Sequence, residues 1–151
     1  MAEHAWTVLC RQVLTDLADD GVVSLVNVVE QLKLPEEIVQ ELAKARGDGL
    51  KGIFVELRFY LVSWWMRSRL DKAETLHYRV SVISPAGEVV SQQELTADLT
   101  QFASQRANIE FSQFPITILG VHYFIVEQRI EGESDESQWI PVARIPLFIS
   151  S

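Results

Sequence analysis

Residues 53–65 constrain the fold most strongly, because apolar side chains recur there at every second position. Successive side chains of a β-strand point to opposite faces, so this spacing predicts a long strand with one face in the core. The predicted core face consists of Ile53, Val55, Leu57, Phe59 and Leu61. The opposite face is charged in its middle and aromatic toward one end; it consists of Phe54, Glu56, Arg58, Tyr60, Val62 and Trp64.

Other segments repeat the strand pattern. Two apolar runs, residues 116–130 and 139–149, flank an acidic segment at 131–137 that contains Gly and Ser. This arrangement predicts a C-terminal β-hairpin. Further strands are expected at residues 6–14, 22–34, 76–82, 89–96 and 108–118, with 97–106 as a helical turn or a loop that directs Leu99 and Phe102 inward. The polar character of 89–96 predicts an edge strand, and Pro115 predicts an edge or a bulge.

One segment departs from the β pattern. Pro35 suits the first turn of a helix, Glu36 and Glu37 suit its positive end, and Lys44 and Arg46 suit its negative end. We therefore expect a short helical insert at about 35–46 that lies across one end or one edge of a sheet. The whole chain, 1–151, then forms a single, mainly β domain: an antiparallel two-layer β-sandwich of about eight strands.

Composition excludes several classes of function. The formal net charge of −8 disfavours nucleic acid and anionic membranes as partners, because both would repel the chain. No apolar run approaches the roughly 20 residues that a membrane helix needs. The N-terminus lacks a secretory signal, and the single cysteine, Cys10, allows no internal disulfide. We therefore expect a cytoplasmic protein.

Three stretches resemble a family of small uncharacterised bacterial proteins with an immunoglobulin-like β-sandwich. They are an N-terminal strand with Cys10 that leads into residues 23–30, the strand and turn at 80–90 with Ser84-Pro85-Ala86-Gly87-Glu88, and Gly120 ahead of Tyr123-Phe124-Ile125-Val126. The resemblance covers most of the chain outside the insert. It implies an immunoglobulin-like fold and brings no catalytic residue, since the family has no assigned activity. The long 131–137 loop and the Trp64-Trp65 pair depart from the family pattern.

Catalytic and cofactor motifs are not supported. Gly47-x-Gly49-x-x-Gly52 has the letters of a dinucleotide fingerprint, but here the helix precedes the strand, so we interpret it as a helix-exit loop. His4, His77 and His122 lack metal-ligand spacing, and we expect the last two to be half-buried structural residues. Cys10 shares a face with apolar residues and is expected to be a buried, inert thiol. We therefore expect neither an enzyme nor a cofactor.

Two binding functions remain. The first is a protein-interaction module that forms a homo-oligomer, such as a homodimer, or binds a partner protein through an aromatic face. Its candidate residues are Arg58, Tyr60, Trp64, Trp65 and Met66. Alternatively the helix covers this face with Ile38 and Leu42, and pairing along the 89–96 edge is a second route to a dimer. The second function is ligand or Ca²⁺ binding by the acidic loops at 16–20 and 131–137.

Overall fold

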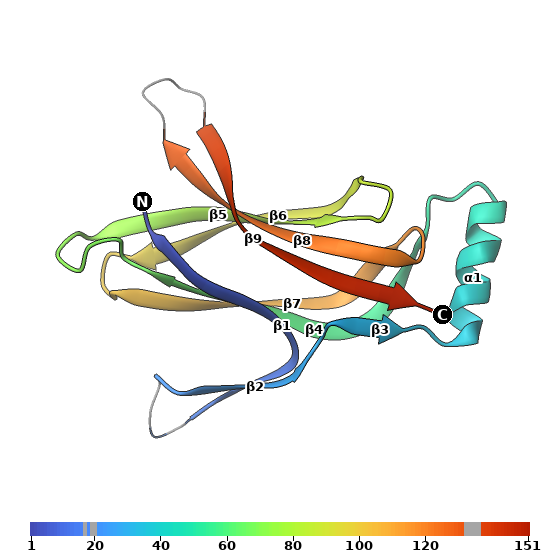
Figure 1. Ribbon diagram of the computed structural model, residues 1–151, viewed down its shortest axis with the longest axis horizontal. Coiled ribbons are helices and arrows are strands. Elements are labelled where there is room, and N and C mark those ends of the chain that lie inside the picture. The colour runs from blue at the N-terminus through green and yellow to red at the C-terminus, as the bar shows by residue number, and fades with distance from the viewer. Residues whose placement is uncertain (17, 19–20, 132–136) are drawn as a thin grey trace.

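The computed structural model describes residues 1–16, 18, 21–131 and 137–151, and this part of the chain contains nine strands and one helix (Figure 1). The elements are β1 (Glu3–Thr15), β2 (Val23–Val28), β3 (Gln31–Lys33), α1 (Glu36–Gly47), β4 (Ile53–Met66), β5 (Glu74–Ile83), β6 (Val89–Leu99), β7 (Ser104–Ile116), β8 (Gly120–Glu131) and β9 (Ser137–Ser150). The protein is therefore mainly β, as predicted.

The strands form two sheets. One has the order β2-β1-β4-β7 and the other β3-β9-β8-β5-β6. All pairings are antiparallel except that of β3 with β9, which is parallel. The predicted C-terminal hairpin is confirmed as β8 and β9, and β6 is an edge strand as expected. Pro115 lies in β7, which is also an edge strand. Proline is tolerated there because an edge strand has a neighbour on one side only and can lack one N–H donor.

Two expectations about strand boundaries were wrong. Residues 22–34 form two strands in different sheets, because Asn27 adopts a positive φ of 55° and the chain then crosses between the layers. The crossing is marked by Val29 N–H, which donates to Leu9 O, and by Phe148 N–H, which donates to Glu30 O. Residues 97–106 are not a helical turn. They contain the end of β6, a short loop at 100–103 and the start of β7, so the loop alternative is confirmed in part. Leu99 is fully buried as expected, whereas Phe102, also expected inward, is 67% exposed.

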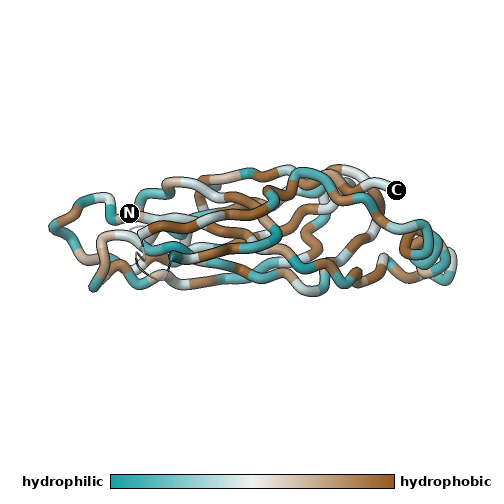
Figure 2. The backbone as a smooth tube through the Cα atoms, turned by 90° about the horizontal axis from the view of Figure 1, so that it is seen from below, coloured by the Kyte–Doolittle hydropathy of each residue, from teal (hydrophilic) through white to brown (hydrophobic). Residues whose placement is uncertain are grey.

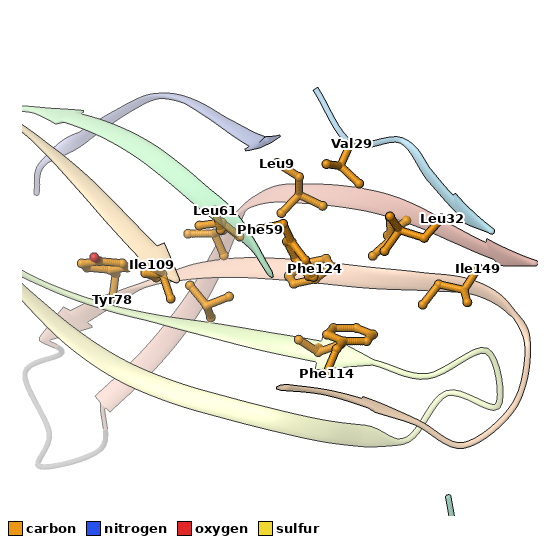
Figure 3. Packing of buried hydrophobic residues seen from close by; sticks show 14 of the residues in the cluster. Leu9, Val29, Leu32, Phe59, Leu61, Tyr78, Ile109, Phe114, Phe124 and Ile149 are labelled. Carbon is orange, nitrogen blue, oxygen red and sulfur yellow. The ribbon is translucent and has the colours of Figure 1, made fainter. Parts of the chain in front are cut away.

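The core lies between the two sheets and is lined by the predicted face of β4 (Figure 3). Phe59 and Leu61 are fully buried. The Phe59 ring stacks on Phe111 with centroids 5.2 Å apart and meets Phe124 edge-on at 5.9 Å. Hydrophobic and hydrophilic residues alternate along the strands of the elongated body (Figure 2). The period-two pattern therefore sorts side chains between the core and the two outer faces.

The predicted helix is confirmed as α1, and it lies at one end of the sandwich beside the C-terminus (Figure 1). It buries Leu42 and Ala45, while Arg46 donates from Nη1 to Thr117 O at 2.7 Å. These contacts attach the helix near the start of β4, away from the aromatic half of that strand. At 12 residues, α1 is the one helix of the described segments, and it is too short and too polar to span a membrane.

Candidate interaction surface

β1 changes its pairing partner halfway along its length. Its first half pairs with β4 up to Cys10, which lies opposite Tyr60, and from Cys10 onward β1 pairs with β2. The second half of β1 and the whole of β2 form a two-stranded arm that turns back beneath β4 and β7 (Figure 1). The arm, residues 10–15 and 23–28, thus lies on the side of the sheet that faces away from the core.

An aromatic surface lies on this outer face. Trp6 of β1 pairs with Trp64 of β4, and Arg106 of β7 lies opposite Trp64 on the other side. The Trp6 and Trp64 rings have centroids 6.2 Å apart at an angle of 44°. Tyr60 continues the surface along β4, and Trp6, Tyr60 and Trp64 are all half-buried. We call these three residues together with Arg106 the aromatic surface.

A hollow of about 480 Å³ opens between the aromatic surface and the arm. Its lining consists of Trp6, Gly21, Val23, Trp64, Ser104, Gln105 and Arg106. Trp6 and Trp64 are the aromatic members of this lining, and Ser104, Gln105 and Arg106 of β7 are its polar members. Pockets of roughly 300–1,000 Å³ with apolar walls and a few polar groups are typical of binding sites in proteins. This hollow therefore has the size and the chemistry to receive a small group from another molecule.

The structure separates the five residues predicted for this surface. Tyr60, Trp64 and Met66 lie half-buried on the outer face, and Arg58 is exposed there. The Arg58 side chain forms an ion pair with Glu110 at 3.0 Å. These four share one face because they occupy even positions of β4.

Trp65 is placed elsewhere, since it is fully buried in the core. Its ring lies 5.2 Å from Tyr78 and 5.0 Å from His4, centroid to centroid. The expectation that Trp65 belongs to an interaction surface is therefore wrong in this fold, because a step of one residue reverses the face of a strand. Sequence reasoning also missed Trp6 and Arg106, whose positions beside Trp64 depend on strand register.

One sequence-based alternative held that α1 covers the aromatic surface. In the structure α1 does not cover it. The helix lies beside the first residues of β4, whereas Tyr60 and Trp64 are in its second half. Val62 and Cys10 on the same outer face are nevertheless fully buried. Their burial between neighbouring aromatic side chains and beside the arm shows that this face is partly enclosed by the chain itself.

Cys10, His122 and the loop after α1, which were also considered in the sequence, have structural positions. Cys10 is a free, buried thiol, and burial raises its pKa, so it is poorly suited to nucleophilic chemistry. His122 is fully buried rather than half-buried, and burial lowers its pKa, while Nδ1 contacts Gly120 O at 3.3 Å. Gly47 ends α1 and β4 begins at Ile53, which confirms the helix-exit loop.

Most of the proposed Ca²⁺ loops lies outside the described residues, which omit 17, 19–20 and 132–136. Within the part of the chain that is described, no group of three or more His, Cys, Asp or Glu residues could hold a metal ion.

No model of a known protein family matches this chain, and comparison with curated proteins gives no significant match.

Proposed function

We propose that this protein is a non-catalytic interaction module of the immunoglobulin-like bacterial type, and that it self-associates or binds a partner protein through the aromatic surface. The observation that carries the proposal is the hollow between Trp6 and Trp64, with Arg106 at its rim. Tryptophan and arginine are enriched among residues that dominate binding energy at protein interfaces. The single, buried Cys10 supports a reducing, cytoplasmic setting.

The shape of the site supports a protein partner. The two indole rings are already held by cross-strand pairing, so little side-chain entropy is lost when a partner docks. The hollow suits an apolar or aromatic side chain inserted from a partner. Ser104 and Gln105 can donate or accept hydrogen bonds there, and Arg106 can donate hydrogen bonds to an acidic group of the partner. This is the arrangement of an apolar centre with a polar rim.

The test compares two variants that remove aromatic groups from the same face. Trp6→Ala combined with Trp64→Ala empties the aromatic surface. Phe54→Ala is the matched control, because Phe54 is on the same face of β4, is 73% exposed and does not line the hollow. Each protein is immobilised and used to capture partners from a cell lysate, and each captured partner is then titrated against it.

We expect wild type and Phe54→Ala to bind the same partner with equal affinity. The double variant should bind at least about 30-fold more weakly, which corresponds to a loss of about 2 kcal/mol at a central interface residue. Circular dichroism establishes that the double variant is folded. Equal capture by the double variant and the control would contradict the proposal.

A further inference from the structure

The outer edge of β2 differs from every other sheet edge in the described chain. A strand at the end of a sheet presents unpaired backbone N–H and C=O groups to solvent, and proteins protect such edges with charges, proline or short length. The four edge strands are β2 and β7 in one sheet, and β3 and β6 in the other. β2 reads Val-Ser-Leu-Val-Asn-Val and has neither a charged residue nor proline.

The other three edges have recognisable protection. β7 contains Arg106, Glu110 and Pro115, and β6 contains Glu94 and Asp98. β3 is only 3 residues long and ends in a lysine. The sequence-based suggestion of pairing along 89–96 therefore has a charged edge to overcome, whereas β2 has none.

Exposed apolar side chains accompany this unprotected edge. Val22, the residue just before β2, is 48% exposed, and Val28, the last residue of β2, is 58% exposed. Leu14, on the β1 half of the arm, is 47% exposed and lies opposite Ser24. The arm therefore presents an apolar side to solvent together with a free backbone edge, and both are features of a surface that accepts another strand.

We propose that two copies of this chain pair through β2, antiparallel about a two-fold axis, and so join their four-stranded sheets into one. The register that centres on Leu25 sets Val22 of one copy opposite Val28 of the other, and the reverse. The four exposed valines of the dimer are then covered in two symmetry-related contacts. Isologous pairing of this kind is the commonest way in which soluble proteins form dimers.

The side chains of β2 favour a second copy as the occupant, because the register sets exposed valine against exposed valine. The chain has a net charge of −8, so copies repel each other over most of their surface. β2 is the edge on which strands of two copies meet with no charged side chain facing another. Antiparallel pairing also keeps Asp16 of one copy at the opposite end of the new sheet from Asp16 of the other.

This inference deepens the proposed function but uses residues other than the aromatic surface. Trp6→Ala with Trp64→Ala should leave the dimer intact even if it abolishes partner binding. Dimerisation and partner binding can therefore be lost separately. A protein that does not dimerise contradicts the β2 proposal, and a double tryptophan variant that still binds its partner contradicts the proposed function.

The test is the mass in solution, measured by light scattering after size-exclusion chromatography. Wild type should have twice the chain mass of 17.2 kDa. Val22→Lys with Val28→Lys sets like charges directly opposite each other in the proposed register, which is destabilising, and should reduce the mass to one chain. Val22→Lys with Val28→Glu instead sets opposite charges together and should restore the dimer.

Val89→Lys is the matched control, since Val89 is on the β6 edge and its exposed fraction of 57% is similar to that of Val28. It should remain a dimer. A wild-type monomer at high concentration, or a double-lysine variant that stays dimeric, would overturn the proposal. A Lys/Glu variant that stays monomeric would overturn the register.

A measurement on the unmodified protein removes any dependence on how the variants fold. Hydrogen exchange of the β2 amides should slow as protein concentration rises through the dimerisation range, while the β6 edge amides should exchange at a constant rate. Concentration-independent exchange along β2 would equally overturn the proposal.

Discussion

Gly52→Ala should be strongly destabilising, because β7 closely approaches the loop that enters β4. A Cβ added at Gly52 would lie 2.2 Å from Ile116 O and 2.8 Å from Thr117 Cα, distances that real Cβ atoms essentially never show. The obstacle is backbone rather than a flexible side chain. Ile116 is also paired with Ile53 at the end of the β4–β7 ladder, so it has little freedom to retreat.

The magnitude follows from this geometry. Steric overpacking of a packed site costs about 1–3 kcal/mol, and displacement of the ladder end adds about 1 kcal/mol for a weakened hydrogen bond. We therefore expect Gly52→Ala to lower the free energy of unfolding by about 3 kcal/mol. For a chain of this size, that corresponds to a fall in Tm of roughly 6–12 °C.

Two neighbouring glycines provide a graded control. Gly49 has a φ of +85° with open space around it, so Gly49→Ala should cost about 1–2 kcal/mol of backbone strain alone. Gly47 ends α1 with nothing within 4 Å of the added Cβ, so Gly47→Ala should stabilise by about 0.5 kcal/mol. Urea denaturation of the three variants measures the series. A Gly52→Ala protein as stable as wild type would refute the close approach.

Two further predictions concern buried groups. Trp65→Ala should lower the free energy of unfolding by about 3–5 kcal/mol, because Trp65 fills the core. Trp64→Ala should lower it clearly less, since the Trp64 ring is half-buried. Similar losses for the two variants in thermal denaturation would contradict the assigned faces. Burial lowers the pKa of His122 from 6.5, so the folded state binds fewer protons than the unfolded chain, and stability should be complete above pH 6.5 and fall as the pH drops from there toward the lowered pKa. His122→Leu should flatten the dependence of Tm on pH between about pH 8 and about pH 5, and an unchanged slope would show that other groups, such as His4, cause it.

The strands and the helix were predictable because their signals are local. The alternation in β4 depends on neighbouring residues alone, and the charges at both ends of α1 mark the helix without any tertiary contact. The same alternation required that Trp64 and Trp65 lie on opposite faces. It also placed Trp65 in line with the predicted core face, which includes Phe59 and Leu61. Trp65 was nevertheless assigned to the surface because it follows Trp64 in the chain, and it packs against Tyr78 in the core.

The boundaries that failed depend on distant parts of the chain. β2 and β3 read as one apolar run, and their division reflects the availability of two different partners, β1 in one sheet and β9 in the other. Phe102 was expected inward because it is apolar, yet the turn between β6 and β7 leaves it in solvent. Local propensity has no information about which strand lies alongside.

The sequence by itself determined that this chain is a mainly β protein with one helix, since periodicity and the charges at helix ends are encoded residue by residue. The tertiary structure alone decided where β1 bends and how Trp6, Trp64 and Arg106 meet across three strands. It also decided that β2 would be an edge, although its uncharged sequence would equally suit the inside of a sheet. Pairing between distant strands depends on the whole packed chain, and this is the physical reason that the candidate surface emerges only in three dimensions.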